Sequence, residues 1–347
     1  MQLALWQQDD PGSRGSRLEK QRRVSAAPRR RSAALVEPTL AEVREEVQRL
    51  SQHAYARNTR RAYQSDWDAF SRWCSTYGER SMPATVDALR SYIAYLGMSG
   101  LRPSTIRRKR VAIGLAHAHA GLPRPDLDAR VREIEHGLAK TKGSREVGAD
   151  PLLAEHVLQI VKTLDDSARG DRDRAIFTLA FAGAFRSSEI VALEREHITF
   201  TETGAIVSVA RSKEDQLGRG KKTDICFGAR AETCPVRALQ RWLARVGEGD
   251  GPVFRVMHGQ VIANERMSTR AISRAVQRAV SIVGLQSTER GFSSHSFRKG
   301  FITTADARGE SDSAIAAHCR YESVLSLGRY IMRGHVPHRR NIAEGML

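Results

Sequence analysis

The sequence predicts a mainly α-helical protein of two domains, the second of which also holds a small antiparallel β-sheet. Its 347 residues are enough for two ordinary domains, and 41% of them are hydrophobic, which allows each domain a core. Apolar residues recur at helical spacing through residues 39–140, whereas residues 151–347 mix helical patterns with two strand patterns. We therefore expect an all-helical N-terminal domain followed by a mixed α+β domain.

The charge predicts a polyanionic partner, most simply nucleic acid. There are 56 lysine and arginine residues against 39 aspartate and glutamate residues, which gives a formal net charge of +17. Arginine supplies most of the basic residues, and a GC-rich genome would also enrich arginine without any functional reason. Charge alone leaves both explanations open.

Other classes of protein are disfavoured. No run approaches the roughly 18 apolar residues of a membrane helix, and the N-terminus lacks the basic region and long apolar run of a signal peptide. The four cysteines form no CxxC pair, so we expect neither a disulfide framework nor a zinc site. These features suit the reducing cytosol.

We divide the chain into four segments. Residues 1–38 are polar and rich in arginine, so we expect a disordered basic arm that either follows a DNA backbone or only solubilises the protein. Residues 39–140 form the helical domain, and residues 141–150, which are polar and contain glycine, form a linker. Residues 151–347 form the mixed domain with its C-terminal tail.

Three helical patterns stand out in the helical domain. The first, NTRRAYQSDWDAFSRWCSTYG, would take Asn58 or Thr59 as its N-cap and end at Gly78. The second is TVDALRSYIAYLGMSG, and the third, PSTIRRKRVAIGLAHAHAG, would start from Ser104. The third carries four basic residues in one turn: Arg107, Arg108, Lys109 and Arg110.

This basic turn has two explanations. It could be an ordinary solvated helix face, although surface helices usually mix charges of both signs. It could also contact DNA, and we favour this because no acid lies among the four residues. We count Arg60 and Arg61, near the start of the first helix, as DNA contacts too.

The mixed domain begins with helical sequence and then turns to strands. DRDRAIFTLAFAGAF predicts a buried helix that ends near Gly183. GAIVSVA and KTDICFG predict two strands, joined by the long polar turn RSKEDQLGRGK. Helices are then predicted in CPVRALQRWLARVG, STRAISRAVQRAVSIVG, SSHSFRKGFITTADARG and SDSAIAAHCR.

Two pairs of residues, each three positions apart, could carry chemistry. His295 and Arg298 would lie on one face of a helix that starts at Ser293 or Ser294, where free N–H groups attract phosphate. Such a pair combines a guanidinium with a proton-transfer group, but about one HxxR is expected by chance in a chain so rich in arginine. Arg186 follows the buried helix with Glu189 three residues on, and this pair could equally be an ordinary buried ion pair.

Three further candidates are unremarkable when each is taken alone. Lys213 lies at the predicted hairpin, where lysines are usually only solvated. Tyr321 and Tyr330 could each be a half-buried core tyrosine.

Taken in order, the candidates resemble the tyrosine recombinase family (Cre, Xer and the phage integrases). The resemblance covers about residues 38–347, and the segments GLPRP and STRAISRAVQRAV are most similar to Cre. It rests on residues that follow one another in the family's order, each on the expected element: Arg186, Lys213, His295, Arg298, Tyr321 and Tyr330.

The resemblance implies a specific reaction. A tyrosine hydroxyl attacks a DNA phosphodiester, which gives a 3′-phosphotyrosine and a free 5′-hydroxyl. Arg186 and Arg298 would stabilise the charge on the non-bridging oxygens, and Lys213 would protonate the departing oxygen. His295 would handle the proton of the phenol or bind the phosphate, and Glu189 would orient Arg186 and the histidine. We expect no metal ion, no ATP and no other cofactor.

A nine-residue interval separates the roles of the two tyrosines. In the family a histidine or tryptophan that binds the phosphate precedes the nucleophile by nine residues. Counting back from Tyr330 reaches Tyr321, so Tyr330 would be the nucleophile and Tyr321 an unusual occupant of the His/Trp position. Cys319 and Arg320 stand where Thr-Gly or Gly-Gly is common. His318 would leave an interval of 12, so we interpret it as an ordinary helical histidine.

The resemblance also implies an assembly on DNA. Four protomers would hold two double-stranded sites, each an inverted repeat, and would exchange strands through a Holliday junction. The C-terminal tail would bind a neighbouring protomer, with Ile342, Met346 and Leu347 as candidate anchors. We expect no membrane partner and a place at the nucleoid of a bacterium, or an origin on a phage or plasmid.

Three alternatives stay open. The first is an integrase of a phage or mobile element that needs accessory proteins. The second is a type IB topoisomerase, which shares the chemistry but acts without a defined site. The third is a DNA-binding protein with a dead site, for which the tyrosine at position 321 is the only hint.

Overall fold

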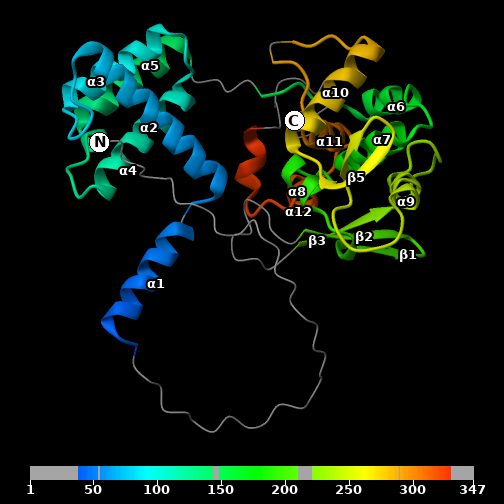
Figure 1. Ribbon diagram of the computed structural model, residues 1–347. Helices are drawn as coiled ribbons and strands as arrows, with labels where there is room; N and C mark the ends of the chain where they lie inside the picture. Colours follow the sequence, from blue (N-terminus) through cyan, green and yellow to red (C-terminus); the bar gives the residue numbers. More distant parts are fainter. Residues whose placement is uncertain (1–37, 54, 144–147, 210–220, 289, 330–347) are drawn as a thin grey trace, which may run out of the picture. The chain divides into compact units, whose positions relative to one another are not determined.

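The computed structural model describes residues 38–53, 55–143, 148–209, 221–288 and 290–329. The chain divides into two compact units between Glu146 and Val147, which lies inside the predicted linker, residues 141–150 (Figure 1). Each unit has its own hydrophobic core.

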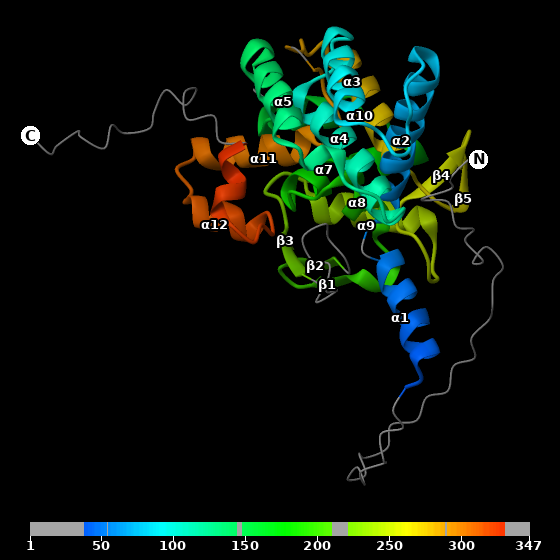
Figure 2. The ribbon, with the colours of Figure 1, turned by 90° about the vertical axis from the view of Figure 1, so that its left-hand side faces the viewer.

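The N-terminal unit is all-helical, as predicted. Apolar residues at helical spacing meet in one core, in which Phe70, Tyr92 and Ile113 are fully buried. Figure 2 shows α3, α4 and α5 side by side, in agreement with their contacts. The elements are α1 (Leu40–His53), α2 (Arg57–Tyr77), α3 (Val86–Met98), α4 (Pro103–His119), the 3₁₀ turn η1 (Pro125–Leu127) and α5 (Ala129–Lys142).

The starts of two helices differ from the prediction. Helix α2 begins at Arg57 with Ala56 as its N-cap, so neither Asn58 nor Thr59 caps it. Helix α4 begins at Pro103 and not at Ser104, because proline suits the first turn of a helix, where its missing N–H is not needed. The predicted end of α2 is confirmed, since Gly78 adopts the left-handed conformation with φ of 70°.

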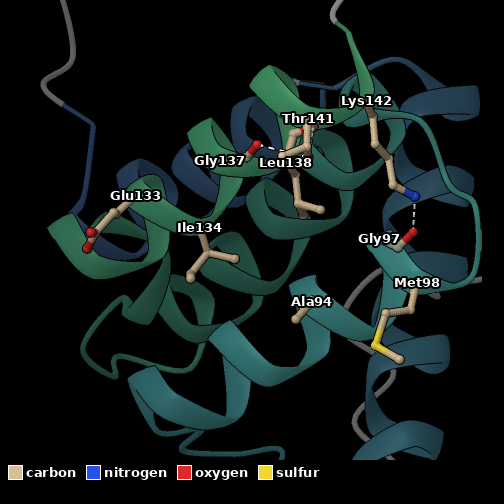
Figure 3. A pocket seen from close by; sticks show the side chains of 9 residues that line it. All are labelled: Ala94, Gly97, Met98, Glu133, Ile134, Gly137, Leu138, Thr141 and Lys142. Atoms are coloured by element: carbon tan, nitrogen blue, oxygen red, sulfur yellow. Dashed lines mark hydrogen bonds between the residues drawn. The ribbon is translucent and has the colours of Figure 1, made fainter.

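An open groove of about 610 Å³ lies between α3 and α5. Small residues line it, among them Ala94 and Gly97 on α3 and Gly137 on α5, and Lys142 donates to the carbonyl oxygen of Gly97 at one end (Figure 3). Glu133 is the one carboxylate in the lining. The groove holds no set of acids, bases or nucleophiles that could carry out a reaction.

The C-terminal unit is mixed, as predicted, with two small antiparallel sheets of strand order β1-β2-β3 and β4-β5. Its helices are α6 (Ala154–Lys162), α7 (Ala168–Ala182), α8 (Ser187–Ala192), α9 (Pro235–Val246), α10 (Thr269–Val283), α11 (Ser296–Ala307) and α12 (Asp312–His318), with 3₁₀ turns η2 (Arg195–His197) and η3 (Val324–Arg329). Its strands are β1 (Ile198–Thr201), β2 (Gly204–Val209), β3 (Lys221–Cys226), β4 (Arg255–His258) and β5 (Val261–Arg266).

The predicted hairpin is confirmed, but three other strands lie outside the prediction. Strands β2 and β3 pair from Gly204 opposite Cys226 to Val209 opposite Lys221. Strands β1 and β5 are largely exposed and β4 is only half-buried. Strand β1, with the sequence ITFT, alternates apolar and polar residues over only four positions, and β4 and β5 show no such alternation, so these strands give a weak signal in the sequence.

Helix α7 runs through the core of this unit and ends before Gly183, as predicted. The ring of Phe177 on α7 lies 5.2 Å from that of Phe297 on α11. Helix α11 also approaches the chain at Leu152, where a Cβ atom on Gly300 would lie 1.7 Å from the carbonyl oxygen of Leu152. Only glycine fits at this contact. The packing holds the end of α7 next to α11, which is where the predicted site residues lie.

Candidate active site

Four of the predicted site residues meet beyond the end of α7. Arg186 and Glu189 come with α8, Arg298 with α11, and Tyr321 follows α12. Figure 1 shows α8 and α12 beside β3, in agreement with the hydrogen bonds that join these segments. Two predicted residues lie outside the described part of the chain: Lys213, in the connection between β2 and β3, and Tyr330, which follows η3.

Arg186 and Glu189 form the contact that their spacing predicts. Arg186 is the N-cap of α8, and its backbone N–H donates to Glu189 Oε2 at 2.9 Å. Its Nη1 donates to the other carboxylate oxygen, Oε1, at 2.8 Å. The carboxylate therefore both caps the helix and holds the guanidinium.

Arg298 is buried, with 2% of its surface exposed. Its Nη1 donates to the carbonyl oxygen of Ala184 at 2.6 Å and its Nη2 to that of Cys319 at 2.5 Å. Its Nε donates to the hydroxyl oxygen of Tyr321 at 3.2 Å. The guanidinium thus ties α11 to the end of α7 and to the segment after α12, and its orientation is set by three bonds.

Tyr321 lies beside both predicted phosphate-binding arginines. The guanidinium carbon of Arg298 is 4.4 Å from the ring centroid, and that of Arg186 is 5.7 Å from it. The hydroxyl oxygen accepts a hydrogen bond from Arg298, so it acts as an acceptor in this contact. The position is compatible with the phosphate-contact role that the nine-residue interval predicts.

Arg320 belongs to the same cluster, although the sequence did not identify it as a site residue. It is 3% exposed, and its Nη2 donates to Glu189 Oε2 at 2.9 Å. Its Nη1 donates to the carbonyl oxygen of Gly183 and to the hydroxyl of Thr223, both at 2.9 Å. No local pattern could have revealed it, because these partners lie about a hundred or more residues away along the chain.

Two non-glycine residues at the site have a left-handed backbone. They are Ala184 with φ of 45° and Arg320 with φ of 59°. This conformation costs about 1–2 kcal/mol for a residue with a Cβ atom. The carbonyl oxygen of Ala184 accepts from both Arg298 and Arg320, so the strained turn presents an acceptor to both guanidinium groups.

Among the described residues, the cluster has more cations than acids. The guanidinium groups of Arg186 and Arg320 donate to one carboxylate, that of Glu189, and the guanidinium of Arg298 lies against Tyr321. Burial raises the pKa of Glu189, but Arg320 together with the backbone N–H and guanidinium of Arg186 outweighs it, so this pKa lies below its usual value. Within the described part of the chain, an ionised Glu189 therefore stands against three guanidinium groups. Such a site fits a phosphodiester, whose charge is negative.

His295 is exposed at the N-cap of α11. The prediction that this helix starts at Ser293 or Ser294 is wrong, because it starts at Ser296, and His295 precedes it. The backbone N–H of His295 donates to the hydroxyl of Ser293 at 3.3 Å. The imidazole thus belongs to a helix N-terminus, where free N–H groups also attract an anion.

His318 has the contacts of a structural residue. Its Nε2 donates to the carbonyl oxygen of Ala182 at 2.8 Å, and its ring stacks on Phe301 at 4.5 Å. Burial lowers the pKa of His318, and the hydrogen bond to Ala182 only partly opposes this. Next to it, burial raises the pKa of the Cys319 thiol to about 11, so this thiol stays protonated at neutral pH.

The basic turn of α4 is largely neutralised by acids from other elements. Asp66 on α2 accepts from Arg108 at 2.5 Å and from Lys109 at 2.9 Å. Arg110 lies 3.4 Å from Glu135 on α5 and 3.6 Å from Asp126 in η1. No acid lies within the turn, but acids from elsewhere in the chain pair with these cations.

Exposure separates the predicted DNA contacts into two groups. The side chains of Arg107 and Arg108 are 65% and 42% exposed, whereas those of Lys109 and Arg110 are each 13% exposed. Arg61 is exposed and Arg60 is half-buried. Arg107 and Arg108 remain candidates for phosphate contact, while Lys109 and Arg110 connect helices.

Two other features are absent from the described residues, a membrane-spanning helix and a metal site. In that part of the chain no helix has both the length and the apolar character to cross a membrane. The same residues contain no group of three or more histidines, cysteines and acids placed to hold a metal ion.

Comparison with known proteins identifies the family of this chain. Residues 151–333 match the Phage integrase family, and residues 47–117 match the N-terminal SAM-like domain of phage integrases. An integrase/recombinase XerD homolog of Selenomonas ruminantium is 35% identical over 81% of this chain and 83% of its own length. Recombinase Cre of Escherichia phage P1 is 25% identical over 68% of this chain and 72% of its own. Sequence identity therefore does not single out Cre.

The fold has solved counterparts. A lambda integrase tetramer bound to a Holliday junction superposes with a TM-score of 0.59 at 15% identity, over 86% of this chain and 79% of that one. At this identity the likeness shows the fold alone. The match over residues 151–333 and the identity with the XerD homolog go further. The chain belongs to the phage integrase family, the tyrosine recombinases.

Proposed function

We propose that this protein is a site-specific recombinase that cuts and rejoins double-stranded DNA through a 3′-phosphotyrosine, with Tyr330 as the nucleophile. The observation that carries the proposal is the position of Arg186 and Arg298 over the ring of Tyr321. This arrangement brings two guanidinium groups and a phenol together, and the phenol is that of Tyr321, nine residues before Tyr330 in the chain.

The arginines would stabilise charge that develops during the attack. A five-coordinate phosphorus places extra negative charge on the two non-bridging oxygens, and preorganised donors lower its energy. Arg298 uses three of its five N–H groups on the described protein atoms, which leaves one on each terminal nitrogen for the phosphate. Glu189 would keep Arg186 aimed at the same oxygens.

The proton steps would fall to Lys213 and His295. The bond between the Tyr330 oxygen and phosphorus forms while the bond to the 5′-oxygen breaks. The phenol proton passes to His295 or to solvent, and Lys213 supplies the proton that the 5′-oxygen needs. Because the phosphodiester energy is kept in the tyrosine ester, the reverse steps reseal DNA without ATP, and the arginines take the charge-stabilising role of a metal ion.

Recombination would need four copies on two DNA sites. The lambda integrase tetramer on a Holliday junction supports this as the assembly of a protein with the same fold. Inverted repeats would let two copies bind one site symmetrically. A cavity of about 310 Å³ lined by Phe181, Phe301 and Ile315 offers apolar walls on which Ile342, Met346 and Leu347 of a neighbouring copy could anchor. Such a protein would work at the nucleoid of a bacterium or on phage or plasmid DNA.

A nicked suicide substrate tests the nucleophile. The target duplex would be recovered from DNA flanking the gene, and a nick near the scissile position would trap the covalent adduct. We expect an adduct with the wild type, also in EDTA and without ATP. Tyr330→Phe should abolish the adduct, and Tyr321→Phe should only slow its formation.

The same reagents distinguish the alternatives. An adduct that persists in Tyr330→Phe would show that another residue attacks. Relaxation of any supercoiled plasmid without a site preference would favour a topoisomerase, and DNA binding without any adduct would favour a dead site. A need for added host proteins would favour an integrase with accessory factors.

A further inference from the structure

We propose that Arg320 is a positioning residue that, through Glu189, holds Arg186 in place for the cleavage reaction. The inference rests on the proposed function, because it assigns Arg320 a role in that reaction. Arg320 would not touch the DNA itself, because both N–H groups on each of its terminal nitrogens already donate to protein acceptors.

The carboxylate of Glu189 is shared between two arginines. Its Oε1 accepts from Arg186 Nη1 at 2.8 Å, while its Oε2 accepts from the backbone N–H of Arg186 and from Arg320 Nη2, both at 2.9 Å. Arg320 thus adds a second guanidinium to the carboxylate, on the oxygen that the Arg186 guanidinium does not use. Without Arg320 the carboxylate would keep only its two bonds to Arg186, and its hold on the Arg186 guanidinium would weaken.

Arg320 also spans several segments. Besides Glu189 on α8, its guanidinium binds the carbonyl oxygen of Gly183 after α7 and the hydroxyl of Thr223 on β3. Its own carbonyl oxygen accepts from Lys221 Nζ at 3.4 Å. The side chain therefore holds α8 against the strand that follows the connection carrying Lys213.

Stability alone does not account for an arginine at this position. Its φ of 59° is a conformation that glycine adopts without strain. Burial lowers the pKa of Arg320, which means that the fold disfavours its charged form, and only Glu189 opposes this strongly. Its Nε is buried and has no hydrogen-bond acceptor among the described residues. A glycine would avoid all three costs but would leave Glu189 with one guanidinium.

The test compares two scissile linkages in the full-length protein. A methylphosphonate replaces one charged non-bridging oxygen with a neutral methyl group, so its cleavage demands less from the arginines. The variants are Arg320→Met, which removes the charge, and Arg320→Gly, which also suits the backbone. Arg186→Ala is the reference for a lost phosphate contact. Arg172→Met is the control, because Arg172 is also buried but donates to Asp173 on its own helix.

We expect both Arg320 variants to slow adduct formation on the phosphodiester by about 10- to 100-fold. On the methylphosphonate the loss should shrink to within about 3-fold, as for Arg186→Ala, because less charge needs stabilising. Arg172→Met should change both rates by one common factor. The acid limb of the pH–rate profile should also move to higher pH in Arg320→Met, because Arg320 lowers the pKa of Glu189.

Two results would overturn the proposal in different ways. If Arg320→Met and Arg320→Gly slow both linkages by the same factor at equal folded fraction, Arg320 is only structural, and the proposed function stands. If the wild type forms no adduct on its own target, the proposed function fails first and the role of Arg320 fails with it.

Discussion

The two units contain charged clusters that look alike in composition and differ in how their cations are paired. On α4, Arg108 and Lys109 share Asp66, and Arg110 meets Asp126 and Glu135, so each of these cations has a carboxylate partner. In the described part of the C-terminal unit, Arg186 and Arg320 share Glu189, whereas Arg298 donates to two carbonyl oxygens and to the hydroxyl of Tyr321. The carboxylates of the first cluster join helices, whereas in the second a guanidinium with no carboxylate partner among the described residues lies beside a phenol ring.

The difference shows that the number of basic residues in a segment does not identify an anion site. The sequence RRKR on α4 looks the more basic of the two, but its acids arrive from other helices. What identifies a candidate site is which cations lack a carboxylate after folding, together with how much of each guanidinium is already used. By this measure we propose the phosphate site in the C-terminal unit, and on α4 we propose DNA contact for Arg107 and the exposed part of Arg108.

The largest expected effect comes from replacing a predicted phosphate-binding arginine by lysine, which keeps the positive charge but removes the paired N–H groups of the guanidinium. We expect Arg298→Lys and Arg186→Lys each to slow adduct formation by about 10²–10³-fold, because an ammonium cannot make two parallel hydrogen bonds to the phosphate. Single-turnover cleavage of the suicide substrate measures the rate. A loss below about 10-fold would mean that charge alone suffices and that the fork geometry has no role.

A smaller effect should follow from removing the carboxylate that joins α2 to the basic turn of α4. Asp66→Asn leaves Arg108 and Lys109 without their carboxylate, and we expect it to lower the free energy of unfolding of the N-terminal unit by about 2 kcal/mol. Hydrogen exchange of the α2 and α4 amides in the full-length protein reports this. The chemical step should be unchanged at saturating DNA. A slowed chemical step with unchanged exchange would contradict the division between the clusters.

A weaker effect separates the cations of α4 from one another. Arg107→Gln should weaken DNA binding and reduce the slope of log Kd against log salt by about one phosphate contact, with no loss of stability. Lys109→Gln is the matched change at a side chain that is only 13% exposed and paired with Asp66, and it should leave the slope unchanged. Equal slopes for the two variants would remove Arg107 as a phosphate contact.

The smallest effect concerns one histidine in each unit. Burial lowers the pKa of His117 and of His318 from the usual 6.5. The folded state therefore binds fewer protons than the unfolded state just below pH 6.5, so stability should fall as pH drops through that range. Thermal unfolding at pH 7.5 and 5.5 measures this. The drop should shrink in His117→Gln but not in His119→Gln, since His119 is exposed.

Part of the site follows from local spacing. The pairing of Arg186 with Glu189 is an i,i+3 contact at a helix start, so the order of residues was enough to predict it. The motif His295-x-x-Arg298 and the interval from Tyr321 to Tyr330 are also readable in the chain. The start of α11 was predicted too early, because Ser293 and Ser294 look like caps but the helix begins at Ser296.

The sequence by itself determined the all-helical first unit, the mixed second unit and the β2–β3 hairpin. It also determined the order of the predicted catalytic residues. Hydrophobic periodicity, the residues that start and stop helices, and short intervals between residues all depend on neighbours along the chain. Tertiary structure decided the balance of charge. The partners of Arg320 lie 97 to 137 residues away, and Asp66 lies 42 residues from Arg108. Only the folded backbone brings such groups together, and burial then decides whether a charge is paired within the protein or left for DNA.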